Sequence, residues 1–277
     1  MKKILILGSA GMAGHMLYKY LKLNENYRVM GVARNKDYGF CDLTLDVNSK
    51  INTLSNLIGE MEFDFIINCV GVLIKDSQDN LSNAIFINGW FPQYLAAITS
   101  NVKTKVIHLS TDCIFSGKNG PYHEKSEPEG EGNYAKTKYL GEINNDKDLT
   151  VRMSIIGPEL KTNGTGLFQW FMKQQGEIRG YGKAIWNGIT TYELAKQIDK
   201  LMSTNLTGIY NLAPPFSISK YGLLCELQTV YDKCDVDIIS DNTVALNKTL
   251  ITNRNKEYSP DIPPYKTQLK ELKEFYK

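Results

Sequence analysis

The chain has 277 residues, enough for one large domain or for a nucleotide-binding domain with a smaller partner. Its 32 basic and 30 acidic residues leave a formal charge of +2, so the charge balance favours neither nucleic acid nor a membrane surface as a partner. The five cysteines are odd in number and lack the paired spacing of a disulfide framework or a metal site. We therefore expect reduced thiols in a reducing compartment.

The hydropathy pattern argues against export and membrane insertion. The first strand-like run begins at Ile4, which leaves no room for a signal peptide before the fold starts. No apolar run approaches the roughly 18 to 20 residues of a membrane span. We expect a cytoplasmic protein that binds small molecules, with a homodimer as its assembly and with no nucleic-acid, membrane or metal partner.

Short β-branched runs alternate with helix-period stretches through the first half. This pattern is typical of repeated βαβ units around a buried parallel sheet. We expect strands over residues 4–7, 28–33, 65–68 and 105–109. A polar loop follows over 116–132, and a loop of this length in a compact fold is usually functional or mobile.

The last third is less regular. Thr190 and Glu193 have the spacing of a capping box, which predicts a helix start, and we also expect a short strand at 209–212 and a surface helix at 266–276. The predicted fold class is α/β, a Rossmann-type doubly wound parallel sheet with a smaller C-terminal substrate-binding region. We assign residues 1–156 to the cofactor-binding and catalytic part and 157–277 mainly to substrate binding, with a diffuse boundary that the chain is free to cross again.

Three glycines, Gly8, Gly11 and Gly14, lie between the first strand and its helix, the context in which a glycine pattern indicates nucleotide binding. A tight turn needs one residue without a Cβ, close approach of a pyrophosphate needs a second, and helix-to-strand contact favours a third. Free N–H groups at the helix start, beside Met12, would then bind the phosphates. An ordinary tight turn is the alternative.

Arg34 lies twenty residues beyond Gly14, at the predicted end of the second strand. An acidic residue there favours the ribose 2′-hydroxyl of NAD, whereas Arg suits the 2′-phosphate of NADP. We therefore expect NADPH as the preferred cofactor, with NADH also accepted. A solvated surface arginine is the alternative.

The pattern Tyr-x-x-x-Lys occurs three times, and each copy places both side chains on one helical face. The copies are Tyr18/Lys22, Tyr134/Lys138 and Tyr192/Lys196. Only the second follows a strand end that also supplies hydroxyls, Ser110 and Thr111, at the sheet edge where open α/β proteins bind ligands. We therefore select Tyr134 and Lys138.

Thr111, Tyr134 and Lys138 together suit a ketone reduction, in which carbon receives hydride and oxygen receives a proton. Tyrosine near pKa 10 is a poor acid–base group at neutral pH, but the Lys138 ammonium would lower that pKa while holding the nicotinamide ribose. Thr111 would donate to the carbonyl oxygen as negative charge develops. Three unrelated surface or packing residues are the alternative.

Asn88 is followed four residues later by Pro92, which cannot donate to the Asn88 carbonyl in a continuing helix. The freed carbonyl could hold water. A simple helix break is the alternative.

Three segments carry a family resemblance. They are His-Leu-Ser-Thr-Asp-Cys-Ile-Phe-Ser-Gly at 108–117, Gly-Pro-Tyr-His-Glu at 120–124, and Asn-Tyr-Ala-Lys-Thr-Lys at 133–138 with Gly141-Glu142. In order and spacing they resemble dTDP-4-dehydrorhamnose reductases, which are extended short-chain dehydrogenases/reductases. The likeness implies reduction of the 4-keto group of a nucleotide-activated 6-deoxysugar by NADPH, in surface polysaccharide precursor synthesis.

The resemblance also implies roles for individual residues. An Asn at the place of Asn88 joins a proton relay to the active-site Lys, an acidic residue at the place of Asp46 faces the adenine, and the stretch after the third strand passes beneath the adenine-side ribose. The expected cofactor contacts are Gly8, Gly11, Met12, Gly14, Arg34, Asp46, Val47, Cys69, Val70, Gly71, Asn88, Tyr134 and Lys138. The expected substrate contacts are Thr111, Asp112, Cys113, Tyr134 and Trp186.

Two departures leave the sugar open. Cys113 stands where the rhamnose-forming enzymes usually have Tyr, and Ile155 stands where they have a sugar-contacting Trp. Because both side chains are smaller than the aromatic residues they replace, the substrate pocket could admit an N-acetyl group on the sugar. The candidate substrates are therefore dTDP-4-dehydrorhamnose and a UDP-2-acetamido-2,6-dideoxy-4-hexulose.

Two other functions stay open. Cys113 and its neighbours resemble the Ser-Ser-Cys-Ile-Tyr stretch of GDP-fucose synthase, whose Cys is an acid–base group for epimerisation, but no His of this chain lies in the later region that supplies that enzyme's second group. The lineage also includes the regulatory subunit of methionine adenosyltransferase. An epimerase/reductase using Cys113 and a non-catalytic NADP-binding subunit are thus the alternatives.

Overall fold

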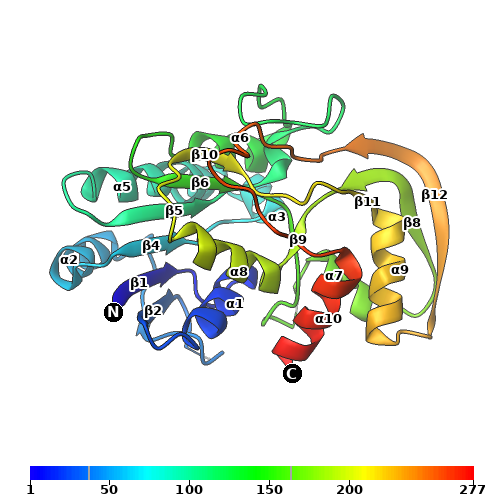
Figure 1. Ribbon diagram of the computed structural model, residues 1–277, viewed down its shortest axis with the longest axis horizontal. Coiled ribbons are helices and arrows are strands. Elements are labelled where there is room, and N and C mark those ends of the chain that lie inside the picture. The colour runs from blue at the N-terminus through cyan, green and yellow to red at the C-terminus, as the bar shows by residue number, and fades with distance from the viewer. Residues whose placement is uncertain (37, 163) are drawn as a thin grey trace.

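The centre of the protein is a parallel sheet (Figure 1). The computed structural model describes residues 1–36, 38–162 and 164–277, and within them seven strands lie in the order β10-β6-β5-β4-β1-β2-β3, each parallel to its neighbours. The strands are β1 (Lys2–Leu7), β2 (Tyr27–Ala33), β3 (Leu43–Thr44), β4 (Phe65–Asn68), β5 (Lys105–Leu109), β6 (Leu149–Arg152) and β10 (Gly208–Asn211). The predicted Rossmann-type α/β class is confirmed.

Helices cover both faces of this sheet, which explains why its strands are apolar without alternation. In β1, Ile4 and Ile6 pack toward α1 (Met12–Leu21) and α8 (Thr191–Leu201). Leu5 and Leu7 pack on the other face, against α2 (Ile51–Met61) and α5 (Phe91–Ile98). Each face therefore has its own apolar core.

The strand order reverses beside β1. From β1 the chain runs outward through β2 and β3, and then returns to the other side through β4, β5 and β6. In open α/β sheets the crevice at the carboxyl ends of the strands beside such a reversal is the usual ligand site. The ends of β1, β2, β4 and β5 therefore mark where a cofactor would lie.

A smaller sheet stands beside the large one, at the right of Figure 1. In the described part of the chain it contains β11 (Ile218–Ser219), β8 (Gly176–Trp186) and β12 (Val236–Asn247), with α9 (Lys220–Tyr231) packed on it. Short elements connect the two parts: β7 (Ile155–Ile156), α7 (Leu167–Met172) and β9 (Ile189–Thr190). Strands β6, β8 and β12 were not predicted. β6 contains a buried arginine, and glycines interrupt β8.

The chain crosses from the smaller part back to the large sheet. Thr190 caps α8, accepting a hydrogen bond from the Glu193 N–H at 3.1 Å, so the predicted helix start is confirmed. β10 then pairs with β6, so the segment from α8 to β10 lies with the large sheet.

The terminal helix α10 (Tyr265–Tyr276) was predicted as a surface helix, and that description is incomplete. Leu269 and Leu272 are fully buried, and the Gln268 side chain accepts a hydrogen bond from the Thr190 N–H at 3.0 Å. The partners of this face lie on α8 and α9, far away in sequence, so its burial depends on tertiary contacts. Among the described residues, none of the helices has the length and apolar character needed to cross a membrane.

Candidate active site

The glycine loop after β1 has the geometry of a phosphate cradle. Gly8 adopts φ = +80°, a left-handed conformation that favours glycine, and its N–H donates to the Val32 carbonyl at 2.8 Å. A Cβ on Gly14 would stand 2.1 Å from the Gly8 carbonyl oxygen, so helix α1 approaches the loop too closely for any side chain there. Gly11 begins α1 without a side-chain cap, which leaves N–H groups beside Met12 for an anionic ligand.

The other predicted cofactor contacts gather at the ends of the neighbouring strands. Arg34 follows β2 directly and is exposed, while Asp46 and Val47 follow β3. Cys69, Val70 and Gly71 follow β4, where the Asn68 side chain accepts from the Val70 N–H at 3.1 Å and contacts the ring nitrogen of the buried His108. These positions lie along one edge of the sheet, as their places in the sequence predicted.

The residues after β5 form a buried polar turn. Thr111 caps the short 3-10 helix η2 (Asp112–Ile114): its hydroxyl accepts from the Cys113 N–H at 3.1 Å and donates to the Asp112 carboxylate at 3.2 Å. Tyr134, from α6 (Gly132–Leu140), meets this turn, and hydrogen bonding to Thr111 acts on its hydroxyl. Thr111 and Tyr134 are thus brought together from two distant segments.

Burial controls the ionisation of these groups. It raises the pKa of Tyr134, and the Cys113 and Asp112 side chains raise it further, while Thr111 opposes them. It also raises the pKa of the Cys113 thiol to about 11 and the pKa of Asp112, although Lys220 and Lys248 partly offset the effect on Asp112. At neutral pH the phenol and the thiol therefore keep their protons.

Lys138 lies one helical turn after Tyr134 and is buried. Its ammonium donates to the Leu109 carbonyl at the end of β5 at 2.7 Å. Burial lowers its pKa to about 8, while Glu142 and Cys69 act in the opposite direction. Lys138 therefore lies between the ends of β4 and β5, and its effect on the pKa of Tyr134 stays a prediction.

Asn88 lies in the π-helical segment η1 (Ile85–Trp90), which continues into α5. The helix therefore widens at this point and does not break. The Asn88 side chain bonds both polar groups of the Val72 backbone, at 2.9 and 3.0 Å, and donates to the Thr137 hydroxyl at 3.2 Å. Its backbone carbonyl packs on Gly141, where a Cβ would approach to 1.9 Å. Asn88 thus connects the segment after β4 to the residue before Lys138.

The other two Tyr-x-x-x-Lys pairs lie away from this edge. Tyr18 and Lys22 bond each other and Asp42 beside β2. Tyr192 lies on α8, where it packs against Tyr20 of α1, and Lys196 pairs with Glu193 and Glu271. Hydrogen bonds beside the sheet account for the first pair, and packing between helices accounts for the second.

Trp186, predicted as a substrate contact, is only 3 % exposed. Its indole N–H donates to the Ser154 hydroxyl at 2.7 Å, and Ser154 also hydrogen-bonds the Asp112 side chain. The Lys220 ammonium lies over the Trp186 ring, 4.6 Å from its centre. Lys220 and Ser154 were not among the predicted site residues, because neither belongs to a sequence motif and both approach Asp112 only through the fold.

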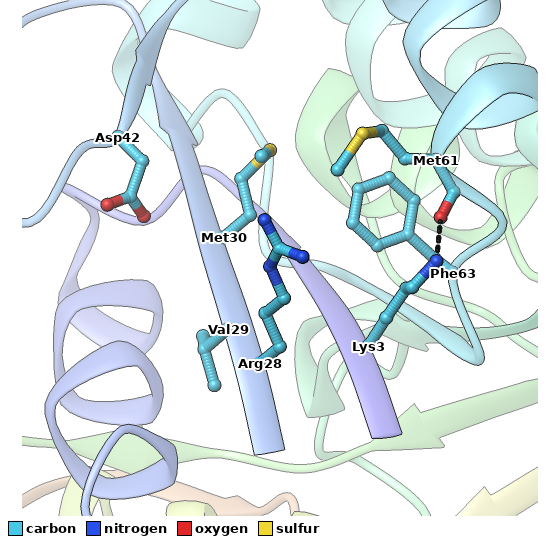
Figure 2. A pocket seen from close by; sticks show the side chains of 7 residues that line it. All are labelled: Lys3, Arg28, Val29, Met30, Asp42, Met61 and Phe63. Carbon is cyan, nitrogen blue, oxygen red and sulfur yellow. Dashed lines mark hydrogen bonds between the residues drawn. The ribbon is translucent and has the colours of Figure 1, made fainter. Parts of the chain in front are cut away.

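The hollow in Figure 2 is a separate feature. Lys3, Arg28, Val29 and Met30 line it from β1 and β2, with Asp42, Met61 and Phe63. Lys3 and Arg28 lie near the starts of their strands, opposite the edge that carries Thr111. None of the predicted site residues lines this hollow.

Comparison with known protein families agrees with this geometry. The RmlD substrate binding domain family matches residues 1–240. The chain belongs to this family. The resemblance to dTDP-4-dehydrorhamnose reductases, drawn from residues 108–142, is thereby confirmed.

Individual members of the lineage are distant. The spore coat polysaccharide biosynthesis protein SpsK of Bacillus subtilis is 25 % identical over 77 % of this chain and 74 % of its own length. The dTDP-4-dehydrorhamnose reductase of Mycobacterium tuberculosis is 27 % identical over 63 % of this chain and 60 % of its own length, so the match spans less than two thirds of that reductase. Methionine adenosyltransferase 2 subunit beta of Xenopus laevis is 24 % identical over 83 % of this chain and 72 % of its own length.

Solved structures share the fold over the whole chain. The dTDP-4-dehydrorhamnose reductase of Bacillus anthracis, crystallised in complex with NADP, has a TM-score of 0.83 at 22 % identity and covers 100 % of both chains. At this identity the likeness establishes the architecture.

A buried ion pair lies next to the candidate site of this RmlD-family member. Arg152, at the end of β6, donates to the Glu142 carboxylate at 2.8 and 2.6 Å, and both side chains are 2 % exposed. The Ser110 hydroxyl donates to the same carboxylate at 2.7 Å. Arg152 also donates to the Glu124 carbonyl at 3.0 Å. In the described residues, no cluster of three or more His, Cys, Asp or Glu side chains is placed to hold a metal ion.

We expect Arg152→Met to lower the free energy of unfolding by about 3 to 5 kcal/mol, because it leaves the Glu142 carboxylate buried without its partner. Urea unfolding followed by circular dichroism measures the change. Lys75→Met, which removes an exposed ion pair with Asp79 on α3 (Ile74–Asp79), is the matched control and should change stability little. Equal effects of the two substitutions would contradict the structural role of the buried pair.

Proposed function

We propose that the protein reduces the 4-keto group of a nucleotide-activated 6-deoxysugar with NADPH, in surface polysaccharide precursor synthesis. The observation that carries the proposal is the convergence of Thr111 and Tyr134 at the carboxyl edge of the sheet, one helical turn from the buried Lys138. Membership of the RmlD substrate binding domain family supports it. A turnover assay with 4-keto nucleotide sugars and NADPH tests it.

The residues of the glycine loop fit a dinucleotide. The left-handed Gly8, the close approach at Gly14 and the uncapped start of α1 leave room and N–H donors for a pyrophosphate. Arg34, at the end of β2, would bind the ribose 2′-phosphate. Bound NADPH would supply the hydride for the carbonyl carbon.

Tyr134 would supply the proton for the carbonyl oxygen. Because burial raises its pKa, the phenol is protonated at neutral pH and ready to donate. Thr111 would donate to the same oxygen as it gains negative charge. Lys138 would hold the nicotinamide ribose and favour the phenolate that remains after proton transfer.

The two candidate substrates are dTDP-4-dehydrorhamnose and a UDP-2-acetamido-2,6-dideoxy-4-hexulose. Cys113 and Ile155 are smaller than the aromatic residues that the rhamnose-forming enzymes have at these places, and this favours a bulkier sugar substituent. Product stereochemistry from a panel of dTDP-, UDP-, GDP- and CDP-linked 4-keto sugars would distinguish the two substrates.

The alternative, a non-catalytic NADP-binding subunit, is supported by the similarity to methionine adenosyltransferase 2 subunit beta of Xenopus laevis. Burial shifts the pKa values of Tyr134 and Lys138, and both groups lie near the Thr111 hydroxyl at the ligand edge of the sheet. Groups with shifted pKa values gather at functional sites, which favours catalysis. A homodimer in the cytoplasm stays our expectation for the assembly and its location.

We predict that Tyr134→Phe lowers turnover roughly 10²- to 10⁴-fold while NADPH binding is kept, since only the proton donor is removed. Single-turnover absorbance of NADPH with a verified substrate gives the rate. Lys138→Met should differ by also weakening NADPH binding, because its ammonium is proposed to hold the ribose.

Tyr18→Phe and Tyr192→Phe are the matched controls, because they remove the same hydroxyl from the two copies of the motif that lie away from the site. Their turnover should stay near that of the unchanged protein. Normal single-turnover reduction by Tyr134→Phe would require a different proton donor.

We predict that the protein binds NADPH more tightly than NADH and that Arg34→Asp reverses or narrows this preference. Loss of charge-assisted hydrogen bonds to the 2′-phosphate should weaken NADPH binding roughly 10- to 100-fold. Fluorescence titrations with both cofactors measure the change. Equal affinities in the unchanged protein would remove Arg34 from the cofactor site.

We predict that Cys113→Ser keeps most of the reductase activity. A thiol with a pKa of about 11 is almost entirely protonated at neutral pH, which makes it a poor base for epimerisation. Reactions in deuterium oxide provide the test. Deuterium at sugar C3 or C5 that disappears in Cys113→Ser would instead support the epimerase/reductase alternative.

A further inference from the structure

Lys220 is a charged residue at the site that the proposed mechanism leaves without a role. It is the first residue of α9, and its ammonium lies over the ring of Trp186. Trp186 donates to Ser154, which hydrogen-bonds Asp112, and Asp112 accepts from Thr111. A continuous chain of contacts therefore leads from the smaller sheet to the catalytic hydroxyls.

The charges around Asp112 do not balance. Lys220 and Lys248, which follows β12, both favour the carboxylate form of Asp112. Asp112 and Cys113 in turn favour the charged form of Lys220, although burial lowers its pKa to about 8. One carboxylate thus faces two ammonium groups.

The Lys220 ammonium also lacks a hydrogen-bond acceptor. Across residues 1–36, 38–162 and 164–277 no protein oxygen accepts a hydrogen bond from it, and it forms no ion pair within 4.0 Å. The Trp186 ring stabilises its charge but supplies no acceptor. Lys220 is half-buried, so its ammonium is open to a ligand that brings an oxygen between Lys220 and Asp112.

We propose that Lys220 is a specificity residue that donates a hydrogen bond to an oxygen on the sugar ring, at a substituent that also faces the Asp112 carboxylate. This inference rests on the proposed nucleotide-sugar function. A donor and an acceptor placed together suit a substituent that has both, namely a hydroxyl or an acetamido group. A carboxylate substituent would be repelled by Asp112, and a deoxy position would leave the Lys220 ammonium without an acceptor.

Isothermal titration calorimetry of the NADPH-bound protein tests this without turnover. The ligands are UDP, UDP-N-acetylglucosamine, dTDP and dTDP-glucose, whose sugars have no keto group to reduce. The unchanged protein should bind at least one nucleotide sugar more tightly than the matching diphosphate. Lys220→Met should weaken the binding of that nucleotide sugar roughly 10-fold or more. It should weaken the binding of the diphosphate by less than about 2-fold.

Two further variants separate contact from folding. Lys220→Gln keeps a neutral donor and should lose less affinity for the sugar than Lys220→Met. Lys183→Met changes an exposed lysine on the neighbouring strand β8 and should bind every ligand normally. Unchanged NADPH titrations show that each variant is folded.

Three results would overturn the inference. The first is an equal loss of affinity for the diphosphate and the nucleotide sugar in Lys220→Met. The second is no loss of affinity in either Lys220 variant. The third is that the unchanged protein binds no nucleotide sugar more tightly than the matching diphosphate. The proposed function is tested separately by turnover of the 4-keto sugars. If the unchanged protein reduced none of them but Lys220→Met still lost the sugar-dependent affinity, the reductase proposal would fail and the role of Lys220 would stand.

Discussion

The enclosed pair of Glu142 and Arg152 is the interaction on which the arrangement of the site depends. Its two side chains come from the segment after α6 and from the end of β6, and Ser110, at the end of β5, bonds the same carboxylate. Helix α6 carries Tyr134 and Lys138, so the pair determines how that helix meets the strand that leads to Thr111. A charge buried this deeply tolerates little displacement, because any loss of its partner exposes the full cost of desolvation.

The same pair connects the site to the smaller part of the protein. Arg152 donates to the backbone of Glu124, and the Glu124 carboxylate accepts from the Asn211 N–H, the Thr252 hydroxyl and the Asn253 N–H. The polar loop at 116–132 is therefore held between the two sheets. These contacts explain how a loop without regular structure can have a defined position beside Arg152.

Burial has opposite consequences for the groups around Thr111. It keeps Tyr134 and Cys113 protonated and makes the ammonium groups of Lys138 and Lys220 easier to deprotonate. A proton donor and a set of cations thus lie in a region of low polarity, where each charge acts strongly on a bound ligand. In the proposed function Lys138 would contact the cofactor and Lys220 would contact the sugar.

The sequence by itself determined the parallel sheet, the glycine loop and the choice of Tyr134 over the two other tyrosines. These features depend on local patterns: apolar runs buried on both faces, glycines at a turn without room for a Cβ, and motifs placed directly after strands. Only the tertiary structure decided the widened helix at Asn88, the buried face of α10, the pairing of Arg152 in a strand that its charge made unrecognisable, and the approach of Lys220 to Asp112. Each of these depends on partners far away in the chain, whose contacts form only when the two sheets and their helices pack together.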